Sequence, residues 1–264
     1  MYSREQVEAM LRRHVESGAP RSRVDGRMLG LSRDAAPVVP LIEPHYGRAF
    51  RGFGGESRKM MHAATYRSIL VAEFRALLDA DPRVVRFASY PHVLTYSTLT
   101  EKGKWVRRSY TPDVVMEVTH PRRMGITTIV VEVRADELRR APSWTTRQLF
   151  IEHAYKMDHG VDFRVYGESE IEKEPRLSNC RRLLGLRWLH GKDAFALRRA
   201  RDVLSETRMD AITVIDLVKA MNLPPPNGDM RAFTCIANMI LRGYLHIDNR
   251  APFDEHTHLH RSAV

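Results

Sequence analysis

Two carboxylates and one guanidinium lie at positions from which they could act on a phosphate group. Asp113 ends the tetrapeptide Tyr110-Thr-Pro-Asp113, and Glu132 and Arg134 lie two residues apart in a run of β-branched residues. Residues two apart in a strand point to one face of a sheet. Carboxylate oxygens are ligands that Mg²⁺ prefers, and a bound Mg²⁺ activates water and neutralises phosphate charge. The pattern therefore predicts a catalytic group of Asp113, Glu132 and Arg134, with Mg²⁺ held by Asp113 and Glu132.

The same residues also have a simpler interpretation. Asp113 and Glu132 can be ordinary acids at strand ends, with Arg134 paired to one of them across the strands. An exposed pair of this kind contributes about 0–1 kcal/mol. Trp105 and Trp144 lie near the same loops, where they could stack on unpaired bases or simply be buried. These residues alone leave both interpretations open.

Hydrophobic periodicity and breaker residues predict the elements that must position this group. Helices are expected at residues 5–15, 66–79, 145–158 and 176–189. Strands are expected at residues 84–88, 93–96, 110–118, 126–133 and 161–166, with a hairpin loop at 119–125. This order predicts an α/β (α+β) fold in which a mixed central sheet is flanked by helices.

A second domain is expected beyond Gly191. Three helices and a hairpin are predicted there: a helix at 193–207, a helix capped by Thr213, a helix at 230–242 ended by Gly243, and a strand at 244–247. This order resembles a winged helix. The third helix carries only Arg231 and Arg242 as basic residues, whereas a DNA-reading helix presents more polar donors, so protein contact is favoured. The expected domains are an N-terminal helix and arm at 1–60, a central domain at 61–190 and a winged-helix-like domain at 191–264.

The motif Tyr110-Thr-Pro-Asp113 followed by Val131-Glu-Val-Arg134 resembles the PD-(D/E)XK nuclease motif. The chain also resembles the TnsA endonuclease subunit of heteromeric transposases over about residues 60–260. Further segments in the same order are similar to its first helix, a strand entry, and its late strand and helix: residues 68–84, Tyr90-Pro91, and 161–171 with Asn179. The resemblance implies a restriction-endonuclease-like sheet, Mg²⁺-dependent DNA cleavage and a C-terminal domain that binds transposition partners.

Two positions depart from that family. Its first helix carries a Glu that completes the metal site, and alignment on Ser68 places this position at Val71 rather than Glu73. Glu73 lies two residues further on, about 200° around the helix. The family's Lys is replaced by Arg134, whose guanidinium is not deprotonated in proteins. The two departures predict a degenerate site with cleavage lost, holding Mg²⁺ if active and no cofactor if degenerate.

The charge balance predicts a nucleic-acid partner. Lysine and arginine total 42 against 32 acidic residues, a net charge of +10. Arginine often occurs in pairs, at positions 12–13, 107–108, 122–123, 139–140, 181–182 and 198–199. Guanidinium groups fit phosphate oxygens well, so double-stranded DNA is the expected partner. A soluble basic surface or contact with an acidic protein would have the same composition.

Two functions are therefore compared. The first is an endonuclease subunit, or a degraded descendant of one, acting with transposase subunits. The alternative is a non-enzymatic phage head–tail connector, neck or other virion protein that contacts neighbouring virion subunits. Only Cys180 and Cys235 occur, and no signal peptide or long apolar run is found, so a cytoplasmic, prokaryotic or viral protein without a membrane partner is expected.

Several histidines could also carry chemistry. His256, His258 and His260 would share one face of an extended segment and could ligate Zn²⁺, although a polar tail is the simpler interpretation. His153 and His159 flank a predicted helix and could line the nuclease groove, although surface positions are more common for them.

The segment 18–55 is predicted to be an extended arm. It contains prolines and a glycine-rich end, which argue against a helix or a central strand. Its apolar residues need a surface to cover them: Val38, Val39, Leu41, Ile42 and Phe50. The arm is expected to lie over its own domain or over a neighbouring subunit, with the neighbour preferred.

Overall fold

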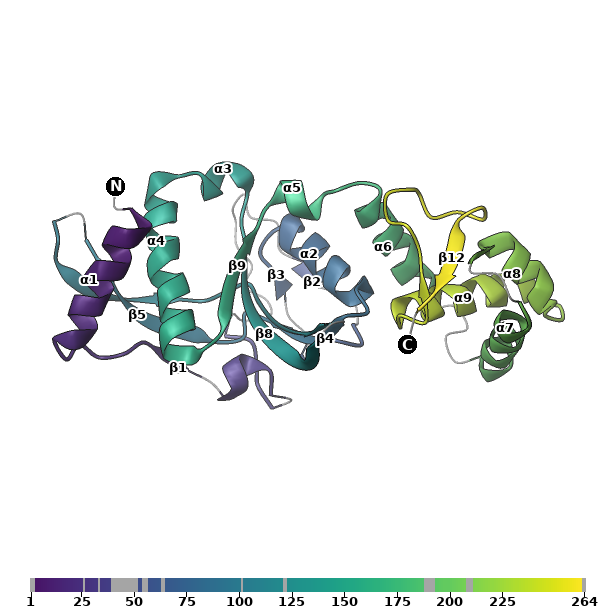
Figure 1. The fold of residues 1–264 in the computed structure, drawn as a ribbon, viewed down its shortest axis with the longest axis horizontal. Helices are drawn as coiled ribbons and strands as arrows, with labels where there is room; N and C mark the ends of the chain where they lie inside the picture. The colour runs from purple at the N-terminus through teal and green to yellow at the C-terminus, as the bar shows by residue number, and fades with distance from the viewer. Residues whose placement is uncertain are drawn as a thin grey trace. The chain divides into compact units, whose positions relative to one another are not determined.

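The chain folds into two compact units in the computed structural model (Figure 1). Unit 1 comprises Met1–Phe74 and Val84–Ile171, and unit 2 comprises Arg75–Arg83 and Glu172–Val264. The structure describes residues 3–25, 27–32, 34–38, 52–53, 57–62, 65–100, 102–120, 123–187, 193–207 and 211–262. No helix among these residues is long and apolar enough to cross a membrane.

A mixed four-stranded sheet forms the centre of unit 1, as the sequence predicted. Its strands are β4 (Val84–Ser89), β7 (Val114–His120), β8 (Arg123–Val133) and β9 (Asp162–Tyr166), in the order β4-β7-β8-β9. β7 is antiparallel to both of its neighbours, whereas β8 and β9 are parallel. The expected loop at 119–125 is shorter than predicted, because β7 and β8 stay paired as far as His120 and Arg123.

Helices cover both faces of this sheet. One face carries Val115, Val130 and Phe163, which share a core with residues of α4 (Pro142–His153). α4 continues into the π-helix η2 (Ala154–Asp158), so the helix predicted at 145–158 ends where expected but begins earlier, at Pro142. On the other face Phe74 of α2 (Ile69–Ala80) packs on Tyr166, with ring centroids 5.0 Å apart. Side chains of successive strand residues therefore lie under different helices.

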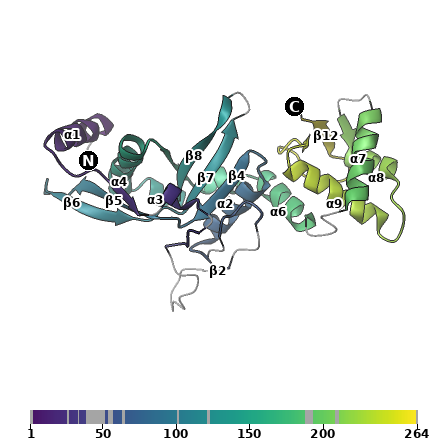
Figure 2. The ribbon, with the colours of Figure 1, turned by 90° about the horizontal axis from the view of Figure 1, so that it is seen from below.

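A second sheet in unit 1 is built from β1 (Arg23–Asp25), β5 (Val93–Leu99) and β6 (Trp105–Tyr110), with β5 in the middle (Figure 2). The single strand predicted at 110–118 is wrong, since β6 ends at Tyr110 and β7 begins at Val114. Pro112 lacks the backbone N–H that a continuous ladder would need. The break allows Tyr110 and Asp113 to belong to different sheets.

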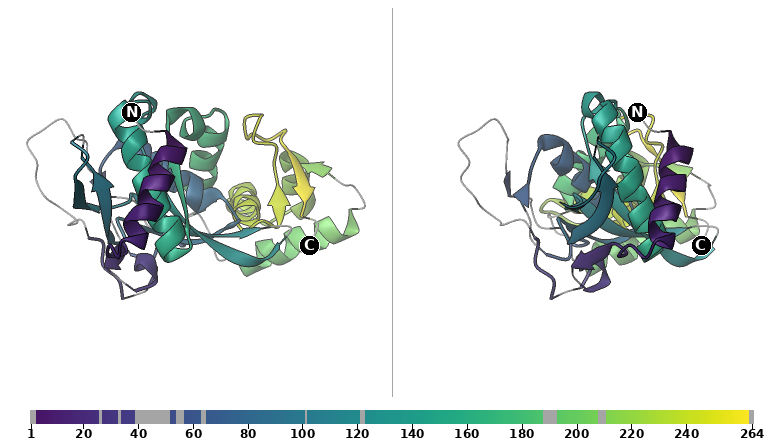
Figure 3. Two further views of the ribbon diagram at one scale, coloured as in Figure 1. Left: turned by 60° about the vertical axis from the view of Figure 1, so that its left-hand side comes forward. Right: turned by 90° about the vertical axis from the view of Figure 1, so that its left-hand side faces the viewer.

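The N-terminal segment packs on unit 1 itself wherever it is described. α1 (Arg4–Glu16), which begins at a capping box formed by Ser3 and Gln6, lies alongside α4 and buries Val7 and Leu11 (Figure 3). β1 pairs with β5, and Val38 donates its backbone N–H to the Tyr90 carbonyl. The sequence pattern favoured a neighbouring subunit as the surface under the arm. For this part of the arm that preference is wrong, because the segment packs on its own unit. The rest of its apolar run lies outside the described residues: Val39, Leu41, Ile42 and Phe50.

Short elements complete unit 1. They are η1 (Arg27–Gly30), β2 (Gly52–Phe53) paired with β3 (Thr65–Tyr66), α3 (Asp136–Arg139) and α5 (Glu168–Ile171). The first turns of α3 and α5 cap each other, because Glu168 accepts from the Asp136 N–H and Asp136 accepts from the Ser169 N–H. This reciprocal cap fixes the chain just beyond the ends of β8 and β9.

Unit 2 has the element order of a winged helix. After α6 (Arg176–Leu186) come α7 (Ala194–Glu206), β10 (Ala211–Thr213), α8 (Val214–Met221), α9 (Gly228–Leu241), β11 (Leu245–His246) and β12 (His258–Arg261). The three strands form an antiparallel sheet in the order β10-β12-β11. α6 packs on α9, so unit 2 includes residues 172–190, which the predicted boundary at 191 assigned to the central domain.

Candidate functional site

The structure brings Asp113 and Glu132 together on one face of the central sheet. Val114 pairs with Val131, so the next residue outward on each strand, Asp113 and Glu132, lies opposite the other. Directly opposed residues of an antiparallel pair share a face. This face carries Val130 and is covered by α4. Both carboxylates are buried, with 7% of each residue exposed, which contradicts the simpler picture of two surface acids.

Hydrogen bonds already occupy most of the carboxylate oxygens. Tyr110 donates its hydroxyl to Oε2 of Glu132 at 2.6 Å, and Arg134 donates from Nη2 to Oε1 at 2.9 Å. Oδ2 of Asp113 accepts the backbone N–H of Val133 at 2.8 Å. Glu132 therefore accepts hydrogen bonds from two donors, one of them cationic.

Arg134 is fixed between Glu132 and Trp144. Its guanidinium carbon lies 3.8 Å from the centre of the Trp144 ring, within cation–π distance. Trp144 lies in the first turn of α4 and is 4% exposed, so of the two roles considered for it, burial is the one observed. A guanidinium stacked and paired in this way can neither deprotonate nor move freely toward an attacking water.

The pKa of Asp113 is raised in this arrangement. Burial raises the pKa of Asp113 to about 8, and the neighbouring Glu132 charge adds to the rise. The Val133 N–H, Arg67 and Arg134 act in the opposite direction and offset only part of it. Burial also raises the pKa of Tyr110, which keeps the phenol protonated as a donor to Glu132.

Two further arginines lie near the pair, and sequence reasoning missed both. The Arg67 guanidinium carbon lies 4.7 Å from the Tyr90 ring centre, and the Arg67 N–H donates to the Tyr90 hydroxyl at 2.8 Å. Arg147 of α4 donates from Nε to the Tyr96 hydroxyl at 3.2 Å and lies 5.8 Å from the Tyr110 ring. The Tyr90-Pro91 motif, which was noted in the sequence, gave no indication that either arginine would lie nearby.

Tyr90 links Arg67 to Asp113. It is fully buried, has a left-handed backbone with φ of 48°, and donates its N–H to the Asp113 carbonyl at 2.9 Å. A non-glycine residue in this region stores strain that the surrounding structure must hold. Such outliers cluster at functional sites. Tyr90 positions the backbone of Asp113 and the backbone of Arg67 through these two hydrogen bonds.

Val71 does not belong to the same surface as the carboxylates. It is 2% exposed and lies one turn before Phe74 on the apolar stripe of α2. Phe74 packs on Tyr166, which pairs with Val133, so this stripe covers the sheet face opposite to Glu132. A Glu introduced at position 71 would enter an apolar layer rather than complete a metal site.

The oxygen ligands available at this site do not fit Mg²⁺. The ion needs several free oxygen ligands, and here only two carboxylates converge, three of whose four oxygens accept protein hydrogen bonds. A cation would also lie beside the fixed charge of Arg134. Among the residues that the structure describes, no group of three or more His, Cys, Asp or Glu side chains is suited to a metal.

The histidines noted in the sequence lie elsewhere. His258 and His260 are exposed on β12, and Nε2 of the exposed His256 lies 3.4 Å from Glu255. They form no metal-binding group in the described part of the chain. His159 lies 3.1 Å from the Ser22 hydroxyl, which anchors the N-terminal arm.

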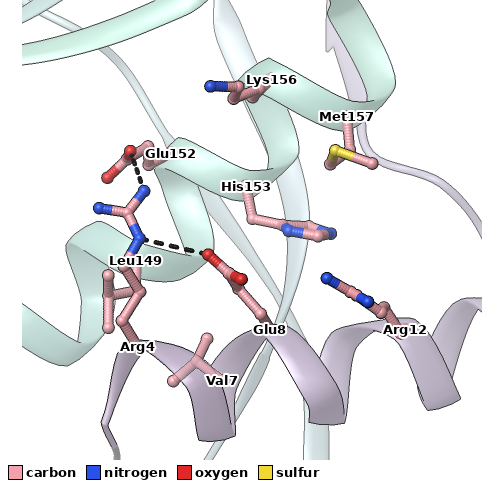
Figure 4. Close-up of a pocket in the computed structure, with 9 residues that line it drawn as sticks. All are labelled: Arg4, Val7, Glu8, Arg12, Leu149, Glu152, His153, Lys156 and Met157. Carbon is pink, nitrogen blue, oxygen red and sulfur yellow. Dashed lines mark hydrogen bonds and ion pairs between the residues drawn. The ribbon is translucent and has the colours of Figure 1, made fainter.

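A small pocket of about 180 Å³ opens between α1 and α4 with η2 (Figure 4). Arg4 closes one end by pairing with Glu8 at 3.2 Å and Glu152 at 2.7 Å. His153 and Arg12 point toward one another across the other end. Burial lowers the pKa of His153, which leaves the imidazole neutral at pH 7. Neither Asp113 nor Glu132 lines this pocket, so His153 does not serve the carboxylate site.

Most of α9 faces its own unit in this fold, and its exposed residues, Asp229 and Met230, lie in its first turn. All its residues from Thr234 to Leu241 are buried, and it packs on α6, α7 and α8 within unit 2. Asn179 of α6 also bonds the segment between β11 and β12, donating to the Ala251 carbonyl and accepting the Phe253 N–H. A recognition helix must present side chains to a groove, and α9 presents them to its own unit.

Comparison with known proteins adds no relative. No protein-family model matches the chain, and no curated protein matches it.

Proposed function

We propose that the protein is a TnsA-like, DNA-associated protein with a nuclease-type fold that no longer cuts DNA and acts within a larger assembly. The observation that carries this proposal is the position of Arg134. It pairs with Glu132, stacks on Trp144 and occupies the place where a nuclease of this class needs a mobile lysine beside a metal.

Three further observations support the proposal. Asp113 and Glu132 lie opposite each other on neighbouring strands, the arrangement that the motif implies. The net charge of +10 favours contact with nucleic acid, and α9 is packed inside unit 2, which leaves the winged-helix-like unit suited to protein contact. The TnsA likeness itself rests on the sequence motifs.

A cleavage assay tests the loss of activity. The full chain is incubated with supercoiled DNA and Mg²⁺ or Mn²⁺, beside Asp113→Ala purified in the same way. The proposal expects equal, background nicking by both proteins. Nicking by the wild type that Asp113→Ala abolishes would show an active nuclease and overturn the proposal.

A gel-shift assay with the same duplex in EDTA tests the DNA association separately. The proposal expects a shift that weakens as salt rises, because phosphate contacts release counterions. A protein that neither cuts nor shifts DNA would not be DNA-associated, and the proposal would then fail on that ground.

A further inference from the structure

The charge around Asp113 and Glu132 has the wrong sign for a metal site. Arg67 and Arg134 both act on the Asp113 carboxylate through their charge, and Arg147 lies over the Tyr110 ring that donates to Glu132. Arg134 contacts Glu132 directly, and Arg67 and Arg147 lie close enough to add positive charge around the two carboxylates. A nuclease centre of this class is anionic and attracts a cation, whereas this centre attracts an anion.

We propose that Arg67 and Arg134 bind a phosphodiester group of DNA directly, without a metal ion. The proposal rests on the DNA association inferred above, and it names the ligand of the same site. Guanidinium forks bind the paired oxygens of a phosphate in one plane, which a point charge does not.

Arg67 is built to receive such a group. Its guanidinium is exposed, and it donates no hydrogen bond to any described residue. It is nevertheless held in place, because it lies on the Tyr90 ring and its own backbone N–H bonds the Tyr90 hydroxyl. A fixed cation with free donors loses little side-chain entropy when an anion binds.

Arg134 and Trp144 provide the second observation. Only Nη2 of Arg134 makes a hydrogen bond, and its buried Nε has no partner in the described part of the chain. The indole N–H of Trp144, a residue that is 96% buried, is also without one. Buried donors are normally satisfied, so these two indicate that an acceptor is missing from the site.

Nucleic acid is favoured over an acidic peptide as the source of that acceptor. The chain as a whole carries a charge of +10 with paired arginines, which gives the long-range attraction that a polyanion needs. A peptide carboxylate would satisfy the same guanidinium groups, and it enters the experiment as a competitor.

The test is fluorescence anisotropy of a labelled short duplex with the full chain in EDTA, from about 50 to 200 mM salt. Arg67→Ala is compared with Arg164→Ala. Arg164 is an exposed arginine of β9 in the same unit, and it pairs with Val131 on the sheet face away from Glu132. Both variants remove one positive charge, and neither residue is buried. Arg67→Lys keeps the charge but removes the fork.

Arg67→Ala is expected to weaken binding about tenfold and to lower the salt slope by about 1, whereas Arg164→Ala changes affinity by less than about twofold. Arg67→Lys should fall between them. Equal losses in Arg67→Ala and Arg164→Ala would overturn the phosphate site and leave general DNA association intact. Duplex binding that appears only when Mg²⁺ replaces EDTA would also overturn it, in favour of a metal site.

Two outcomes separate this inference from the proposed function. Absence of any duplex binding by the wild type would overturn both. Arg67-dependent displacement of the duplex by a short polyglutamate peptide at lower concentration than by an unlabelled duplex would assign the site to a protein carboxylate, and would overturn the choice of DNA.

Discussion

The two units of the molecule differ in how their candidate binding residues are packed. In unit 1 the charged residues of the motif remain, but Tyr110, Arg134 and Trp144 hold them in a buried polar network. In unit 2 the helix that could enter a DNA groove is surrounded by apolar packing, with α9 residues such as Ile236 and Ala237 fully buried. Unit 1 thus contains a charged and hydrogen-bonded group, whereas the corresponding part of unit 2 is an apolar core.

This difference has a physical origin. A buried charge must be paired or hydrogen-bonded, so a buried carboxylate pair without a metal ion needs another cation beside it. Arg134 provides that cation. A buried apolar helix has no such requirement, because its side chains stabilise the core wherever they touch other apolar groups. Charge substitutions should therefore act differently in the two units.

The largest effect is expected for Val71→Glu. The side chain is 2% exposed on the α2 stripe, so the new carboxylate would be buried without a partner. We expect a loss of about 4 kcal/mol in the free energy of unfolding, against about 2 kcal/mol for Val71→Ala. Denaturant unfolding followed by circular dichroism measures both. A Val71→Glu protein as stable as Val71→Ala would mean that position 71 faces solvent or the carboxylate pair.

A double-mutant cycle on Arg134 should give the next largest effect. Arg134→Met leaves Glu132 buried beside Asp113 with only Tyr110 as donor, and we expect a loss of about 3 kcal/mol. Adding Glu132→Gln removes the uncompensated charge and should recover about half of that loss. If the two substitutions are additive, Arg134 does not neutralise Glu132 and the network in unit 1 is misassigned.

A smaller effect is expected for Asn179→Ala in unit 2. The side chain is 3% exposed and makes two hydrogen bonds to the backbone of residues 251 and 253. Truncation leaves both backbone groups unsatisfied and should cost about 2 kcal/mol. Gly185→Ala on the same helix is the control, because an added Cβ meets no atom within 4 Å and should be neutral or slightly stabilising. Equal stability of the two variants would show that Asn179 does not hold the segment between β11 and β12.

The pH dependence of stability gives the most specific signal. Asp113 has a folded pKa of about 8, above its ordinary 3.8, so the folded state binds its proton more tightly than the unfolded state. Its contribution is complete below about pH 4 and is lost as pH rises toward 8. The wild type should therefore lose stability relative to Asp113→Asn over this range.

The Asp113→Asn comparison is needed because His92 acts in the opposite direction. Burial lowers the pKa of His92 from 6.5 to about 4, so its contribution is lost as pH falls through that window. His92 is unchanged in the variant, and its effect cancels in the difference. A difference between wild type and Asp113→Asn that does not change with pH would mean that Asp113 is ionised throughout.

The sequence predicted the parts of the site that are encoded locally. Two strands with alternating and apolar residues, separated by a turn, place Asp113 opposite Glu132, and strand alternation puts Arg134 on the same face. The partners that decide the chemistry come from distant segments: Tyr110 from another sheet, Trp144 from α4, and Arg67 from the turn before α2. Periodicity identifies each of these elements but does not say which face of the sheet each one covers.

Two differences between the local sequence pattern and the fold have specific causes. Alignment placed Val71 at a ligand position, yet the helix stripe that contains Val71 packs on the other face of the sheet. The strand predicted through Pro112 was split, because the apolar and aromatic residues on both sides of the proline resemble one continuous run. In both cases the local pattern identified the element correctly, but it did not show which sheet, or which face of a sheet, the element contacts.

Titration of Mn²⁺ into the protein by calorimetry tests the central claim most directly, since Mn²⁺ binds the same oxygen ligands as Mg²⁺. The wild type and Asp113→Asn are compared at pH 7.5 in buffer of about 150 mM salt. The account predicts that the two titrations are the same, because Arg134 already neutralises the carboxylate pair. Stoichiometric Mn²⁺ binding by the wild type that Asp113→Asn abolishes would contradict it and would restore the metal-dependent nuclease.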